Sequence, residues 1–173
     1  QAEERVKYLE AKKQMYLITQ TQMETFQFDA NQSSINLNLR KFKYPITELI
    51  WVLRSNTNKN ANHYFNYTDS LINDPNRKGF LESGKLVFDG RDRLPEMNAN
   101  YFTKVEPFKL HENIPDKNTI NCVSFSLEPE NSAQPSGSCN FSYLHEPRFQ
   151  LTTRSGLPAG ELIMFAINYN VLQ

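Results

Sequence analysis

The main pattern in the sequence is the alternation of apolar and polar residues in short runs, which is typical of β-strands with one buried face. Residues 35–40 (INLNLR) show this alternation without interruption. The run 46–53 (ITELIWVL) is instead apolar at every position from Leu49 onward, which indicates a strand covered on both faces. Turn-forming polar clusters and prolines separate the runs. Strands are predicted over residues 14–28, 35–40, 46–53, 84–88, 120–127, 139–144, 148–153 and 161–172.

The sequence predicts little helix. Residues 1–13 have helix-forming composition with apolar side chains roughly on one face, and residues 95–102 fit one or two helical turns. The asparagine-rich stretch 54–62 has no clear period and is expected to form a surface loop. About eight short strands with long loops predict an all-β fold, either an antiparallel sandwich or a barrel, with short helices in the loops.

Large apolar side chains identify the expected core. Trp51 lies in the run that is apolar on both faces, so we expect it in the interior together with Phe125 and Phe165. The last predicted strand alternates, and one set of its side chains is expected to form a single apolar face. This set is Ile163, Phe165, Ile167, Tyr169 and Val171.

Composition and charge exclude several classes of protein. A chain of 173 residues suits one domain, and 12% aromatic residues supply enough buried area to argue against disorder. The chain has 19 Lys and Arg against 19 Asp and Glu, so it lacks the basic excess of domains that neutralise nucleic-acid phosphates. It also lacks an apolar run of about 18 residues, so no transmembrane segment is expected.

Candidate catalytic and metal-binding groups are few. Cys122 and Cys139 are too few for a disulfide framework or a four-ligand zinc site, and we expect both to be reduced and buried. His63, His111 and His145 have no partner at metal-ligand spacing and are expected to be solvated or hydrogen-bonded loop residues. No Gly-x-Ser-x-Gly nucleophile motif occurs. We therefore expect no catalytic residue, no cofactor and no metal site.

Three asparagines match the N-glycosylation pattern: Asn31, Asn66 and Asn140. An asparagine-rich chain produces such matches by chance. The charged N-terminal residues lack the apolar region of a secretory signal, so we expect the three sites to be unoccupied.

The stretch from Val123 to Phe141 (VSFSLEPENSAQPSGSCNF) identifies a family through its residue types and not only through its hydrophobic period. It resembles the signature near the C-terminus of the major capsid proteins of large nucleocytoplasmic DNA viruses. Residues 45–52 (PITELIWV) resemble the proline-led strand of that family, and the matches keep the family's order over nearly the whole chain. Ser138 and Tyr143 stand where the family usually has Thr and Arg. The matching core of the signature is Gln134, Pro135, Ser136, Gly137, Cys139, Asn140 and Phe141.

The signature also has a local physical meaning. Proline fixes φ near −65° and glycine allows positive φ, so Pro135 and Gly137 are expected to build a tight corner. Such a corner before Cys139 would direct the next strand back into the fold.

The resemblance implies a double jelly-roll subunit, of which this chain is similar to the second roll. Residues 14–173 would be this C-terminal jelly roll, an antiparallel eight-stranded β-sandwich. Residues 1–13 would be a short helix or linker from a preceding jelly roll that is not in this chain. Three subunits would form a homotrimeric, pseudo-hexagonal capsomer of an icosahedral shell.

The resemblance further implies a structural, non-enzymatic role in the virion capsid, with assembly in the cytoplasm of the host cell. The expected partners are other capsid subunits, neighbouring capsomers and minor capsid proteins, without direct contact to nucleic acid. Two other classes remain as alternatives. A lectin-like, carbohydrate-binding sandwich could stack sugars on Tyr64, Phe65 and Tyr67, and a cupin-like enzyme would require a bound metal.

Overall fold

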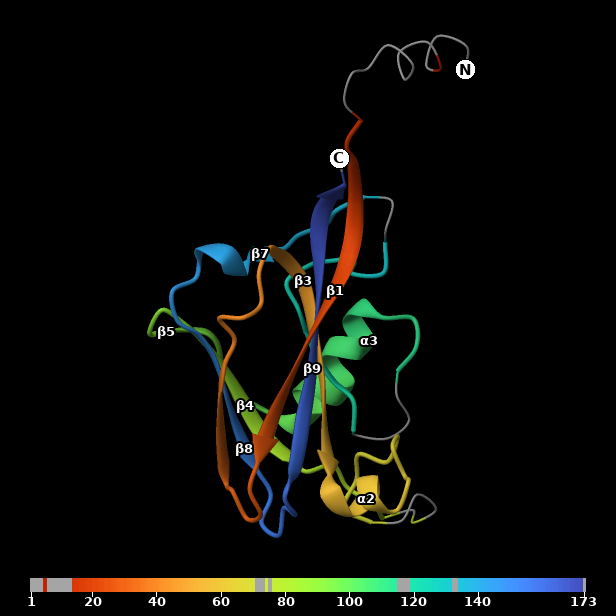
Figure 1. Cartoon of the computed structure of the whole chain (residues 1–173), viewed down its shortest axis with the longest axis vertical. Helices are drawn as coiled ribbons and strands as arrows, with labels where there is room; N and C mark the ends of the chain where they lie inside the picture. The colour runs from red at the N-terminus through yellow and green to blue at the C-terminus, as the bar shows by residue number, and fades with distance from the viewer. Residues whose placement is uncertain are drawn as a thin grey trace.

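The chain folds into two antiparallel β-sheets packed face to face, as the computed structural model shows (Figure 1). This resolves the choice between sandwich and barrel in favour of the sandwich. The helix predicted over residues 1–13 lies outside the described residues, apart from Arg5. The structure describes Arg5 and residues 14–70, 74, 76–114, 119–131 and 134–172.

The first sheet contains the longest strands of the molecule. Its order is β1 (Tyr16–Phe28), β9 (Gly160–Leu172), β3 (Pro45–Ser55) and β6 (Asn121–Ser124). The two-residue strand β7 (Cys139–Asn140) pairs with the start of β3. β1 and β9 lie side by side along the long axis and pair without a register shift from Tyr16 opposite Leu172 to Phe28 opposite Gly160 (Figure 1).

The second sheet closes the sandwich from the opposite side. Its order is β2 (Ser34–Asn38), β8 (Pro147–Thr153), β4 (Leu81–Phe88) and β5 (Arg91–Asn98). The chain crosses repeatedly from one sheet to the other, so neighbouring strands are mostly distant in sequence. This connectivity is that of a jelly roll, which confirms the predicted fold class.

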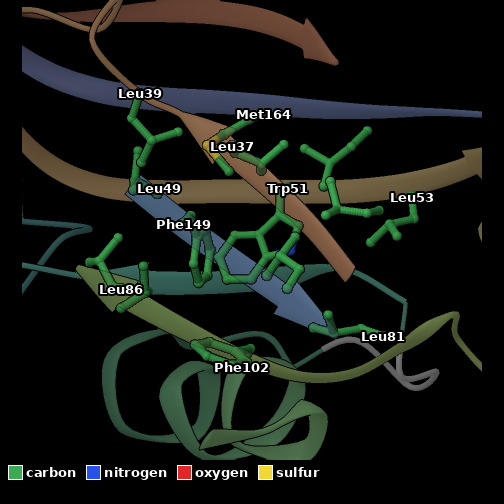
Figure 2. Close-up of a cluster of buried hydrophobic side chains, with 14 of the residues drawn as sticks. Leu37, Leu39, Leu49, Trp51, Leu53, Leu81, Leu86, Phe102, Phe149 and Met164 are labelled. Carbon is green, nitrogen blue, oxygen red and sulfur yellow. The ribbon is translucent and has the colours of Figure 1, made fainter. Parts of the chain in front are cut away.

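The core lies between the sheets and is built around Trp51, whose side chain is fully buried (Figure 2). The ring centroids of Phe102 and Phe149 lie 5.3 and 4.7 Å from that of Trp51, in edge-to-face arrangements that aromatic rings prefer. Phe125 is half-buried against the same core, as expected.

The expectation that Phe165 of the last strand lies in the core is wrong. Leu162, Met164 and Ala166 of β9 point into the core, whereas Phe165 is only half-buried on the other face. Because β9 is apolar at both alternating sets of positions, its period could not show which set faces inward. The other half-buried members of the predicted face are Ile163, Ile167 and Tyr169, and Val171 is exposed.

The helical turns predicted over residues 95–102 are also misplaced. β5 continues through Pro95 to Asn98, because an edge strand tolerates a residue without a backbone N–H. A helical segment follows as η1 (Tyr101–Val105) and α3 (Glu106–Leu110). This segment contacts both β5 and β6, and Phe102 extends from it into the core, so it closes one open edge of the sandwich.

Two further short helices lie in connections between strands. α2 (Asn56–Asn60) occupies the predicted loop 54–62, and the Ser55 side chain caps it by accepting a hydrogen bond from the backbone of Asn58. The strand predicted over 139–144 ends at Asn140, because the chain turns there into η2 (Phe141–Tyr143). Within the described residues, no helix is long and apolar enough to cross a membrane.

Candidate functional site

The outer face of β3 carries a buried acidic side chain. Leu49 and Trp51 point into the core, so the alternating residues Glu48 and Ile50 lie on the opposite face of the sheet. Cys122 of β6 pairs opposite Ile50 and therefore shares that face. Glu48 is 2% exposed and Cys122 4% exposed. A carboxylate buried to this extent requires a charged or hydrogen-bonding partner.

That partner is His111, the residue that ends α3. Its Nε2 lies 2.6 Å from Glu48 Oε1, and its Nδ1 lies 2.9 Å from Glu130 Oε1. A carboxylate oxygen of Glu48, a ring nitrogen of His111 and the Sγ atom of Cys122 all lie within 4.8 Å of one another. We refer to Glu48, His111, Cys122 and Glu130 as the polar cluster. It joins β3, β6, the end of α3 and the loop after β6.

Burial and neighbouring charges shift the pKa values of the residues in the polar cluster. Burial raises the pKa of Glu48, against the opposing influence of His111. Burial alone would lower the pKa of His111, but hydrogen bonds and charge from Glu130 and Glu48 outweigh it and raise that pKa. Burial, with the charges of Glu48 and Glu106, also raises the pKa of the Cys122 thiol. All three shifts favour the protonated forms of these groups.

A second acidic group lies beside the polar cluster. Glu106 of α3 is 8% exposed and accepts a hydrogen bond from the Tyr101 hydroxyl. Burial and this hydrogen bond raise the pKa of Tyr101 to about 12, so the phenol stays protonated at neutral pH. The outer face of β3 and β6 is therefore acidic and organised by hydrogen bonds.

Sequence reasoning did not find the polar cluster. Its residues come from positions 48, 111, 122 and 130, which only the fold brings together. The available signal was Glu48 itself, a single charged residue within the apolar run 46–53. His111 is hydrogen-bonded, as expected, while His63 and His145 are exposed.

The signature segment forms a corner rather than an open binding surface. Ser136 anchors it, since its Oγ lies 2.6 Å from Ser126 Oγ and accepts a hydrogen bond of 2.8 Å from the backbone of Glu128. Gly137 has φ +148°, and a Cβ atom there would lie 2.7 Å from the carbonyl oxygen of Phe125. Only glycine fits this close approach, so the predicted requirement for glycine is confirmed. Gln134 and Pro135 are exposed.

The end of the signature is attached to the start of β3. Cys139 and Asn140 pair with Ile46 and Pro45, and the backbone N–H of Phe141 donates to Tyr44. The Phe141 side chain is buried, with ring centroids 5.4 Å from Phe88 and 5.8 Å from Phe125. Tyr143, where the family usually has Arg, is 80% exposed.

The three asparagines of the glycosylation pattern have different surroundings. Asn31 is exposed in a turn with φ 58°. Asn140 is half-buried and accepts a hydrogen bond from the backbone of Ser142. Asn66 is 3% exposed, and its side-chain nitrogen donates to the Ser70 carbonyl, so a glycan there would require this loop to open.

Apolar side chains are exposed at one end of the β1–β9 pair. We call this the apolar ribbon and define it by Tyr16, Leu17, Ile18, Val171 and Leu172, which are between 37% and 57% exposed. Tyr16 pairs with Leu172 and Leu17 with Val171, so both faces of the two-stranded ribbon are apolar and exposed. Clustered apolar surface of this kind marks an interaction site.

Comparison with known proteins supports one family. The family model described as "Large eukaryotic DNA virus major capsid protein" matches residues 4–173. Over 93 residues the chain is 41% identical to the major capsid protein of Phaeocystis pouchetii virus, covering 51% of this chain and 18% of that protein. Over 174 residues it is 30% identical to the major capsid protein of Pyramimonas orientalis virus, covering 87% of this chain and 39% of that protein. The chain thus spans well under half the length of these relatives.

Solved structures show the same fold. The chain matches the crystal structure of PBCV-1 VP54 fitted into a cryo-EM reconstruction of the virophage Sputnik, with a TM-score of 0.81 at 25% identity. That match covers 99% of this chain and 52% of VP54. The Faustovirus major capsid protein gives a TM-score of 0.77 at 15% identity, covering 91% of this chain and 34% of that one.

Proposed function

Because the chain belongs to the large eukaryotic DNA virus major capsid protein family, we propose that it is the C-terminal jelly roll of a subunit that forms homotrimeric, pseudo-hexagonal capsomers. The match of the family model to residues 4–173 carries this proposal. Residues 14–173 make up the jelly roll, and residues 1–13 link it to a preceding jelly roll. The coverage of 52% of VP54 supports a subunit with room for a second roll.

In this proposal the molecule is a structural unit of the shell. The two sheets form a stiff wall, and the signature segment, from Gln134 to Phe141, ties the loop after β6 to the start of β3. The near-neutral charge leaves little long-range repulsion between closely packed copies. Its partners are other capsid subunits, neighbouring capsomers and minor capsid proteins. The shell assembles in the host cytoplasm and forms the virion capsid.

The proposal assigns the apolar ribbon to a second jelly roll of the same subunit. The ribbon is apolar on both faces yet exposed on both, so an adjoining roll would bury surface that this chain leaves in water. Its strand β1 begins at Tyr16, directly after the proposed linker. In the proposed subunit the ribbon therefore lies next to the linker that connects the two jelly rolls.

The oligomer is tested with the full-length subunit by sedimentation velocity and electron microscopy. Obligate interfaces bury more than about 2,000 Å², so we expect a trimer at micromolar concentration and hexagonal arrays of capsomers. A subunit that sediments as a monomer and forms no arrays would contradict the proposal.

The ribbon assignment is tested by Leu17→Glu in the same full-length subunit. A charge in a buried apolar contact should lower its melting temperature by several degrees. Thr19→Glu is the matched control, because Thr19 is an exposed polar residue of the same strand. Equal melting temperatures for both variants would place the second jelly roll elsewhere.

The lectin-like alternative rests on two neighbouring aromatic side chains, Tyr64 and Phe65, which are 46% and 85% exposed. Exposed aromatic rings can stack on sugars. Binding to a glycan array that Phe65→Ala abolishes would favour this alternative, and the absence of binding would remove it.

A further inference from the structure

We propose that Glu48, His111 and Cys122 form a zinc site on the outer face of the first sheet. The three residues offer one oxygen, one nitrogen and one sulfur donor, and these atoms lie within 4.8 Å of one another. A mixed set of carboxylate, imidazole and thiolate suits Zn²⁺ better than Mg²⁺ or Ca²⁺, which take oxygen ligands. The proposal does not depend on the role of the chain in a shell.

The orientation of His111 is that of a metal-binding histidine. Its Nε2 points at Glu48, while its Nδ1 lies 2.9 Å from the Glu130 carboxylate. Metal-ligating histidines typically donate their second ring N–H to a carboxylate or carbonyl, which fixes the ring and its tautomer. Glu130 is therefore a positioning residue in this site, not a ligand.

The three ligands are also supplied by three different secondary-structure elements. Glu48 lies on β3, Cys122 on the neighbouring strand β6, and His111 at the end of α3. Glu48 and Cys122 are buried, so water competes poorly for the ion. Three protein donors leave one tetrahedral position, which a water molecule would fill.

Binding requires a small and defined rearrangement. Two ligands on one zinc ion lie farther apart than the 2.6 Å between Glu48 Oε1 and His111 Nε2, so the ion would separate them and take the place of their hydrogen bond, whose proton would pass to solvent. Cys122 would lose its thiol proton at the same time. Zn²⁺ then balances the charges of the Glu48 carboxylate and the Cys122 thiolate.

The experiment uses the full-length protein, stripped with a chelator and titrated with Co²⁺ as a spectroscopic substitute for zinc. We expect one Co²⁺ per chain, with a thiolate-to-cobalt charge-transfer band and the visible bands of tetrahedral coordination. Cys122→Ser should abolish the charge-transfer band, whereas Cys139→Ser should keep it, because Cys139 is the other free cysteine and lies outside the site. Circular dichroism verifies that each variant is folded.

Zinc affinity and stability give a second, independent measurement. A hundredfold excess of ZnCl₂ over the Kd should raise the melting temperature by about 3–4 °C. Glu130→Gln should weaken zinc binding by about 10- to 100-fold but leave the charge-transfer band in place at saturation. The site would be refuted by a stoichiometry far below one, by no thiolate band, or by a band that disappears in Cys139→Ser instead of Cys122→Ser.

Discussion

The two faces of β3 are stabilised in opposite ways. On the inner face, Leu49, Trp51 and Leu53 are surrounded by apolar side chains, and their contribution grows with the area removed from water (Figure 2). On the outer face, Glu48 depends on hydrogen bonds from two residues, His111 and Cys122, which both lie far away in sequence. The inner face tolerates any well-filling apolar set, whereas the outer face requires particular partners at particular positions.

The outer face has a second charged group at the other end of the same strand. Arg54 Nε donates a hydrogen bond of 3.0 Å to Glu161 of β9, and Lys59 Nζ lies 3.4 Å from the same carboxylate. The Glu161 side chain is 9% exposed and that of Arg54 17%. The outer face of β3 therefore carries a charged side chain with a specific partner at Glu48 and again at Arg54.

The largest effect is expected on the inner face, for Trp51→Ala. Loss of a fully buried indole leaves a cavity, so unfolding free energy should fall by about 3–5 kcal/mol in urea titrations. Phe165→Ala is the matched control, because Phe165 is half-buried on the outer face of β9. An equal loss of unfolding free energy in the two variants would contradict the idea that the inner face contributes more stability because it is more deeply buried.

On the outer face, Glu48→Gln in metal-free buffer should lower the unfolding free energy by about 2–3 kcal/mol, because the His111 side chain loses a charged partner in a buried site. A double-mutant cycle with His111→Gln should show most of this loss as coupling between the two residues. Glu112→Gln, at an exposed neighbour of His111, should have little effect. Additive losses in the cycle would mean that Glu48 is stabilised by something other than His111.

Glu161→Gln should lower the unfolding free energy by about 1–2 kcal/mol at pH 7, and the size of this loss should depend on pH. The hydrogen bond from Arg54, helped by Lys59, lowers the pKa of Glu161 below its usual 4.5. Since this pKa is depressed in the folded state, the stabilisation is present above pH 4.5 and is lost as the pH falls through the folded-state pKa. Chemical denaturation at pH 7 and at about pH 3 should therefore show a smaller difference between wild type and variant at the lower pH. A difference that is constant across this range would contradict the ion pair.

The smallest effect is expected for an ion pair in solvent. Lys41 Nζ lies 2.8 Å from Glu24, but the lysine side chain is 73% exposed. Lys41→Ala should lower the unfolding free energy by less than about 0.5 kcal/mol, and by still less in high salt, which screens exposed charges. A loss of unfolding free energy as large as that of Glu161→Gln would contradict the expectation that the more exposed ion pair contributes less stability.

The inner face was largely predictable and the outer face was not. The part of the run that is apolar from Leu49 onward placed Trp51 in the core, since a strand segment without polar positions must be covered on both sides. The same reasoning failed for β9, where apolar residues at both sets of positions left the inward set undecided. It also failed for β5, because Pro95 at a sheet edge resembles a helix or turn signal.

The signature residues fall between these two cases. The need for glycine at position 137 followed from local turn chemistry, and the positive φ confirms it. The contact between Ser126 and Ser136 required the fold, as did the polar cluster, because no spacing rule connects residues that meet through separate strands and loops.

The pairing of β1 with β9 has a mechanical consequence. Tyr16 is opposite Leu172, so the segments before β1 and after β9 leave from the same end of the ladder. Tension between those two segments would open the antiparallel pair one rung at a time, as in a zipper, and would load few hydrogen bonds at once. A force that slides β1 along β9 would instead load the whole ladder together. The molecule is therefore expected to be weak against peeling from its chain ends and strong against shear along its long axis.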